Sequence, residues 1–235
     1  MKAVIDDLMG LVGDESKKEG KDLERIKKKY RELLQCITQK DLGAEKDLLL
    51  AVLLFAHSYY DEAMNLTQEK LRDLGEDHDL YPEFCLINIL SYYFDYVTYG
   101  RGISRILARD RAKKFLEKRE DPRIYNALGV VLLSFITEAS KNNDEIIESE
   151  VIENYQKALS CINESKKNFG DLEFVLKNNI ADAILRKKDI SPQESREVRN
   201  LVDQVSNIEY HFVKDTVAKF FEKEFRESKE GRFLE

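Results

Sequence analysis

Apolar residues recur three and four positions apart along nearly the whole of this chain, which is the spacing of one face of an α-helix. Segment 21–40 shows the pattern clearly, because Leu23, Ile26 and Tyr30 are separated by charged residues. No segment of the chain alternates polar and apolar residues in the way that a half-buried strand does. The spacing therefore predicts an all-α protein.

We expect about ten helices joined by short loops. Beyond 21–40, the expected helices are 44–57, 60–74, 82–99, 103–118, 123–140, 150–165, 172–187, 192–206 and 209–227. Capping signals mark three of the starts: Asp121 before Pro122, Asp171 after Gly170, and Ser191 before Pro192 with Glu194 three positions on. The chain holds only 3 Pro and 10 Gly in 235 residues, too few for a sandwich or barrel of many short strands.

The composition fits a folded chain in a reducing compartment. It is 43% hydrophobic with a net charge of −7, so it has enough apolar residues for a core, and wholesale disorder is excluded. Its longest apolar run, Leu48 to Ala56, is far shorter than the roughly 20 residues that span a bilayer, so no membrane partner is expected. The cysteines Cys36, Cys85 and Cys161 are odd in number and widely spaced, which is typical of free thiols. We therefore expect a cytoplasmic protein.

Four of the predicted helices share a pattern: a large aliphatic residue, a small residue, and a large apolar residue three positions beyond the small one. The four sets are Leu50-Ala51 with Leu54, Leu90-Ser91 with Phe94, Leu128-Gly129 with Leu132, and Ile180-Ala181 with Ile184. Their small residues are 40, 38 and 52 positions apart, so the units have similar but unequal lengths. Because a small side chain lets a neighbouring helix approach closely, the pattern indicates stacked helical hairpins.

These units resemble the tetratricopeptide repeat family over about 44–187. The matching residues are Tyr125-x-x-Leu128-Gly129-x-x-Leu132 in a first helix, Tyr60-Asp61-Glu62-Ala63 at the entry to a second, and Tyr155-x-x-Ala158-Leu159 in its later half. The units are longer than the usual repeat, the largest insertion being Lys141 to Ser149, and Pro122 alone stands near the place of a closing proline. The resemblance implies a right-handed solenoid of antiparallel helical hairpins that binds peptides on its concave face. The alternative is an irregular bundle of the same helices.

We expect one continuous domain, with capping helices over 1–40, hairpins over 41–187 and a C-terminal helical hairpin over 188–235. The last helix has a broad aromatic face with a charged remainder. It either caps the solenoid or docks against another protein. The second possibility leaves two alternatives open: a homodimer through this helix, and a structural subunit of a larger assembly.

Candidates for catalysis are few. His57, His78 and Asp79 resemble the metal ligands of the HD hydrolases, and a helical metal-dependent hydrolase is the enzyme alternative. The His78-Asp79 pair, however, falls in the turn 75–82 instead of on a helix. The segment Gly100-Arg101-Gly102 has no following Gly-Lys-Ser/Thr, so it is no phosphate-binding loop. We expect no enzymatic activity, no cofactor and no bound metal.

Two features indicate binding. Arg101, Arg105, Arg109 and Lys113 recur every four positions and so form a basic stripe along one predicted helix. The stripe either binds an acidic or phosphorylated segment or pairs with Asp110, Glu117 and acids of the adjacent helix.

The second feature is a set of tyrosines, Tyr92, Tyr96 and Tyr99, on one face of the preceding helix. Rings with polar tips suit a recognition groove, although aromatics at this spacing also form cores. The family resemblance adds Asn178 and Asn179, which would bond a peptide backbone from the first helix of the last unit. Our leading hypothesis is a non-enzymatic adaptor or scaffold that binds a protein or peptide. Nucleic acid is not expected, because the chain is acidic and has no aromatic-studded basic motif.

Overall fold

The computed structural model describes residues 43–136, 144–165, 169–187 and 190–205, together with residues 216, 218, 219 and 221; for residues 144–147 it describes the backbone alone. Every regular element in these ranges is an α-helix, so the predicted all-α class is confirmed. The elements are α3 (Gly43–Ala56), α4 (Tyr60–Leu74), α5 (Tyr81–Tyr99), α6 (Gly102–Leu116), α7 (Pro122–Ile136), α8 (Asp144–Glu164), α9 (Leu172–Leu185) and α10 (Pro192–Val205). The helix predicted at 21–40, the cap at 1–40 and most of the helix at 209–227 lie outside the described residues. None of the described helices is long and apolar enough to cross a bilayer.

Two of the three predicted helix caps form. Asp121 Oδ1 accepts the backbone N–H of Arg123 at 2.9 Å at the start of α7. At the start of α10, the Ser191 N–H donates to Glu194 Oε2 at 2.8 Å and the Glu194 N–H donates to Ser191 Oγ at 3.2 Å, which is a complete capping box. Asp171 precedes α9 as predicted, but its side chain makes no capping bond. Its backbone (φ −79°, ψ 3°) is not in the extended conformation that lets a capping side chain turn back onto the helix.

The prediction that α8 begins near 150 was wrong. The helix starts at Asp144, so most of the polar stretch Lys141–Ser149 that we expected to be an insertion is its first turns. No glycine or proline interrupts 144–150, and the acidic residues Asp144 and Glu145 favour a helix N-terminus. Polarity alone is therefore not a loop signal in this chain.

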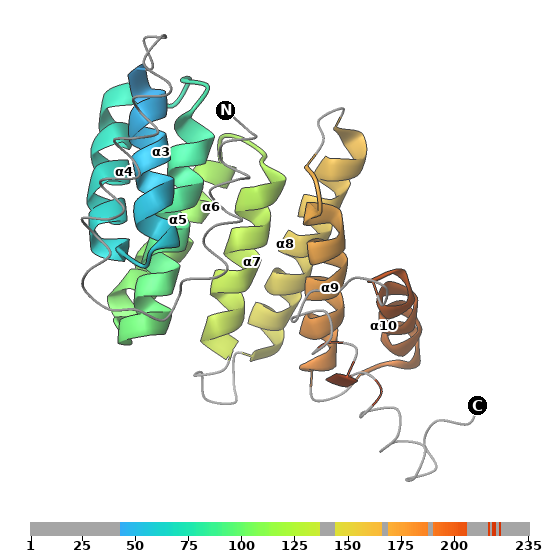
Figure 1. Ribbon diagram of the computed structural model, residues 1–235. Coiled ribbons are helices and arrows are strands. Elements are labelled where there is room, and N and C mark those ends of the chain that lie inside the picture. Colours follow the sequence, from blue (N-terminus) through green and yellow to red (C-terminus); the bar gives the residue numbers. More distant parts are fainter. Residues whose placement is uncertain are drawn as a thin grey trace. The chain divides into compact units, whose positions relative to one another are not determined.

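The chain divides after Phe115 into two compact units. In the first, α4 packs against both α3 and α5, and α3 also contacts α5 (Figure 1). Rings from three helices meet in this unit: Phe94 of α5 lies 5.6 Å from Phe55 and 5.9 Å from Tyr60, measured between ring centroids. Phe94, the large apolar residue of the repeated pattern on α5, therefore packs against the other two helices although it is only half-buried.

The second unit repeats this arrangement. Helix α8 packs against α7 and α9, α7 also contacts α9, and α10 packs against α9 (Figure 1). The approach of α7 and α8 depends on Gly129, because a Cβ atom there would lie only 2.8 Å from Tyr155 Cδ1. All four small residues of the repeated pattern are buried: Ala51, Ser91, Gly129 and Ala181.

Candidate partner-binding surface

Both predicted binding features lie on α5 and α6, which are joined by a tight turn. Gly100 ends α5 with a left-handed backbone (φ 68°), and its N–H donates to Tyr96 O at 2.8 Å. Glycine suits this position because it has no Cβ to clash. Tyr81 of α5 stacks on Phe115 of α6 with their ring centroids 6.3 Å apart, so the two helices also meet at the ends remote from the turn.

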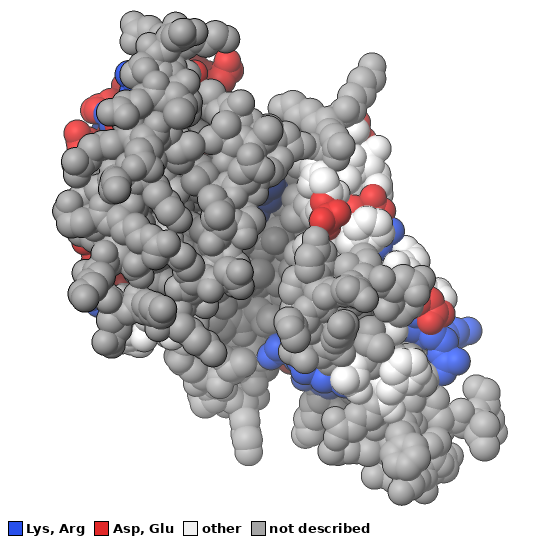
Figure 2. All heavy atoms as spheres, in the orientation of Figure 1, with Lys and Arg blue, Asp and Glu red and all other residues white. Residues whose placement is uncertain are grey.

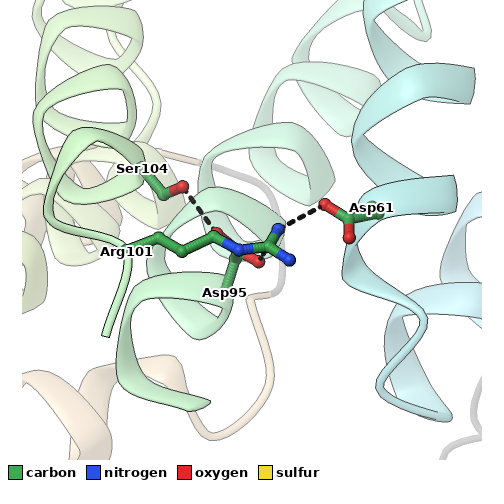
Figure 3. Close-up of polar contacts among 4 residues, drawn as sticks. All are labelled: Asp61, Asp95, Arg101 and Ser104. Carbon is green, nitrogen blue, oxygen red and sulfur yellow. Dashed lines mark hydrogen bonds and ion pairs between the residues drawn. The ribbon is translucent and has the colours of Figure 1, made fainter. Parts of the chain in front are cut away.

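Arg101, the first member of the basic stripe, is held within the unit (Figure 3). Its Nη1 donates to Asp61 Oδ1 of α4 at 2.8 Å and to Asp95 Oδ1 of α5 at 2.9 Å. Ser104 Oγ of α6 donates to the other oxygen of Asp95 at 2.6 Å. The Asp61 hydrogen bond, with the charge of Asp95, raises the pKa of Arg101 above its usual value. The group therefore ties α4, α5 and α6 together, which is the intramolecular pairing that we considered as the alternative to partner binding.

Arg105, the second member, covers a tyrosine. Its guanidinium carbon lies 4.6 Å from the Tyr96 ring centroid, and its Nη1 donates to the Tyr96 hydroxyl at 3.2 Å. Arg109 pairs with its neighbour Asp110 at 2.8 Å. Lys113 is half-buried one turn further along α6. Three of the four members of the stripe, Arg101, Arg105 and Arg109, therefore make contacts within the protein itself.

The three tyrosines of α5 become more exposed toward its C-terminus. Tyr92 is half-buried and its hydroxyl donates to Gln68 Oε1 at 3.3 Å. Tyr96 is half-buried beneath Arg105. Tyr99 is 56% exposed, with the Arg101 guanidinium carbon 5.1 Å from its ring centroid. The last two rings therefore present arginine–aromatic pairs beside the α5–α6 turn.

The most unusual feature of this hairpin, its exposed apolar side chains, was not predicted from the sequence. Seven large hydrophobic side chains are exposed among the described residues, and five of them lie between 97 and 107: Val97, Tyr99, Ile103, Ile106 and Leu107. On α6, Ile103, Ile106 and Leu107 are spaced i, i+3 and i+4, so they adjoin on one face. We call these three residues the α6 patch.

The opposite face of α6 explains why the patch is exposed. Ser104, Ala108, Ala112 and Phe115 are buried and follow one another at helical spacing. Small residues on that face let α6 lie close to its neighbours, which leaves the larger Ile and Leu side chains on the outer face. The sequence signal for the patch is a helix with the small residues Ala108 and Ala112 on one face and large apolar residues on the other. Arginines lie between the two faces, so charge is the more conspicuous feature of this segment.

The two candidate asparagines lie in the other unit, on α9. Asn178 is 3% exposed, and its Oδ1 has no hydrogen-bond partner among the described residues. Asn179 is half-buried and its Nδ2 donates to Asn126 Oδ1 of α7 at 2.9 Å. Asn179 therefore links two helices, while Asn178 is a polar group of the core.

The residues of the hydrolase alternative are not brought together. His57 follows α3 and His78 follows α4, so the two lie at opposite ends of the 15-residue α4, roughly 20 Å apart. His78 Nδ1 accepts the backbone N–H of Leu80 at 3.1 Å within the exposed turn. In the part of the chain that the structure describes, no three His, Cys, Asp or Glu residues gather as a metal site would require.

Comparison with models of known protein families, with curated proteins and with solved structures finds no match.

Proposed function

We propose that this protein is a non-enzymatic, protein-binding helical-repeat module that holds a partner segment on its α5–α6 hairpin. The observation that carries the proposal is the concentration of exposed apolar side chains at 97–107, beside arginine–tyrosine pairs. Monomeric proteins bury or scatter such side chains, and a cluster of them marks an interaction site. Aromatic residues and arginine are also the types enriched in the energetically important part of interfaces.

The packing of each unit supports the repeat part of the proposal. A solenoid of hairpins requires each first helix to contact both its own second helix and the first helix of the next hairpin. Helix α3 contacts α4 and α5 in this way, and α7 contacts α8 and α9. The buried small residues Ala51, Gly129 and Ala181 lie on these first helices. With this reading we propose a cytoplasmic setting, consistent with the free thiols Cys85 and Cys161.

The proposal is tested by capturing partners from native lysate with the full-length chain and two variants. In the first, Ile103→Glu and Leu107→Glu are combined, which places two charges on the α6 patch. The matched control is Phe174→Glu, which makes the same kind of change at an exposed hydrophobic residue of α9. Because all three positions are exposed, we expect the melting temperatures to stay within a few degrees of one another.

We expect the partner to be captured by the unchanged chain and by Phe174→Glu, but lost from the double variant. Equal capture by all three proteins would contradict the assignment of the site to α6. The capture of no stoichiometric partner by any of them would contradict the binding function itself.

A further inference from the structure

The charge that surrounds the α6 patch indicates what kind of partner it fits. Helix α6 carries five cationic residues, Arg105, Arg109, Arg111, Lys113 and Lys114, against the single acid Asp110. The chain as a whole has a net charge of −7, so this helix is a local exception. On the face shown in Figure 2, by contrast, the described charged side chains form small groups of both signs.

The cations and the patch share the outer surface of α6. Lys114 is exposed and lies seven positions beyond Leu107, which is two helical turns along the same face. Helix geometry places Arg109 and Arg111 on either side of that face, about 100° from its centre. The outer face is therefore apolar in its first two turns and has a net positive charge after them. There Arg109, Arg111, Lys113 and Lys114 surround the single acid Asp110, which pairs with Arg109.

The surface also limits the backbone conformation of a partner. A helix bonds its own backbone groups internally, so α6 offers a partner only side chains and no free edge like that of a sheet. A segment that covers Ile103, Ile106 and Leu107 must then satisfy its own backbone hydrogen bonds. A helix does so, and its ridges fit between those of α6.

We infer that the α6 patch binds an acidic amphipathic helix of a partner protein, with apolar residues of that helix on Ile103, Ile106 and Leu107 and its carboxylates toward the basic half of α6. This inference rests on the proposed function and adds the chemistry of the partner. Carboxylates near cations that are partly desolvated by the neighbouring apolar contact give specificity and faster association.

The test is a selection of random peptides of about 16 residues, long enough to form a marginal helix, on the immobilised full-length chain. Peptides that bind the Ile103→Glu/Leu107→Glu chain are removed first. We expect the enriched peptides to carry net negative charge, with apolar residues three and four positions apart. A synthetic peptide of the enriched sequence should bind at least about tenfold more weakly to the double variant. Its binding to the unchanged chain should also weaken when the ionic strength rises from about 0.01 to 1 M.

Two single variants separate the contributions. Lys114→Glu should weaken binding several-fold and flatten the salt dependence, whereas Phe174→Glu should leave both unchanged. Patch-dependent peptides without net negative charge would overturn this inference and leave the proposed function standing. An enrichment that yields no patch-dependent peptide would contradict both. If a single-stranded oligonucleotide displaced the peptide at equal concentration, the basic half of α6 would belong to a nucleic-acid site and the inference would be overturned.

Discussion

Gly129 shows how a single residue sets the distance between two helices. Tyr155 of α8 is 1% exposed and its ring fills the space that a Cβ at position 129 would need. The repeated pattern of small residues predicted that a neighbouring helix approaches closely here, and the packing of α8 on α7 shows the contact. The pattern did not identify the partner, because Tyr155 is 26 positions away and on another helix.

We predict that Gly129→Ala destabilises the protein, because the buried ring has to shift, which costs about 1–3 kcal/mol. The gain of about 1 kcal/mol that alanine has over glycine in a helix offsets only part of this cost. Gly102→Ala is the matched control, since no atom of the described residues lies within 4 Å of a Cβ built there. Denaturant unfolding measures both changes, and an equal effect of the two substitutions would contradict the packing argument.

At the scale of the element, the ends of helices were the most predictable part of the structure. Asp121 and Ser191 act locally, over two or three residues, so their sequence context contains all that is needed for the cap. Arg101 is the opposite case. Its partner Asp61 is 40 residues away, and only the packing of α4 beside α5 brings the two together.

Two carboxylates on the same guanidinium allow a direct comparison of buried and exposed ion pairs. Asp95 is fully buried and also accepts from Ser104, whereas the Asp61 side chain is 54% exposed. We predict that Asp95→Asn lowers the free energy of unfolding by about 2 kcal/mol, the typical loss for a buried hydrogen bond to a charged group. Asp61→Asn should cost less than about 1 kcal/mol. If the two variants are equally stable in chemical denaturation, Asp95 does not tie the helices together.

The capping box of α10 predicts a dependence of stability on pH. Glu194 accepts from Lys187 and Ser191, and these bonds lower its pKa from 4.5 to about 2. A carboxylate with a depressed pKa in the folded state stabilises the fold above its unfolded pKa, and this contribution is lost as the pH falls from about 4.5 toward 2.

Glu194→Gln should therefore cost about 1 kcal/mol or more at neutral pH, where the ionised cap is lost. The difference between the two proteins should shrink as the pH drops below about 4.5. Unfolding curves for both, collected from neutral pH down to about pH 3, give this difference. A difference that does not vary with pH would show that the charge of Glu194 contributes nothing.

At the scale of the whole molecule, both units use the same packing scheme, in which three consecutive helices all contact one another. The described surface is unusual at the outer face of α6, where Ile103, Ile106 and Leu107 are exposed. The helical class and most helix positions follow from local spacing, which a sequence displays directly. The α6 patch does not follow in this way, because exposure depends on which face the neighbouring helices leave uncovered. The small residues Ala108 and Ala112 determine that face, and only the assembled structure shows that they are the buried ones.

The central claim, that the outer face of α6 is a docking surface, is tested most directly by crosslinking in the native cell. A photoreactive phenylalanine analogue is placed at Ile103 in one protein and at Phe174 in another; both positions are exposed and they lie in different units. We predict a discrete crosslinked partner from position 103 and none from position 174. The same products from both positions, or none from position 103, would contradict the account.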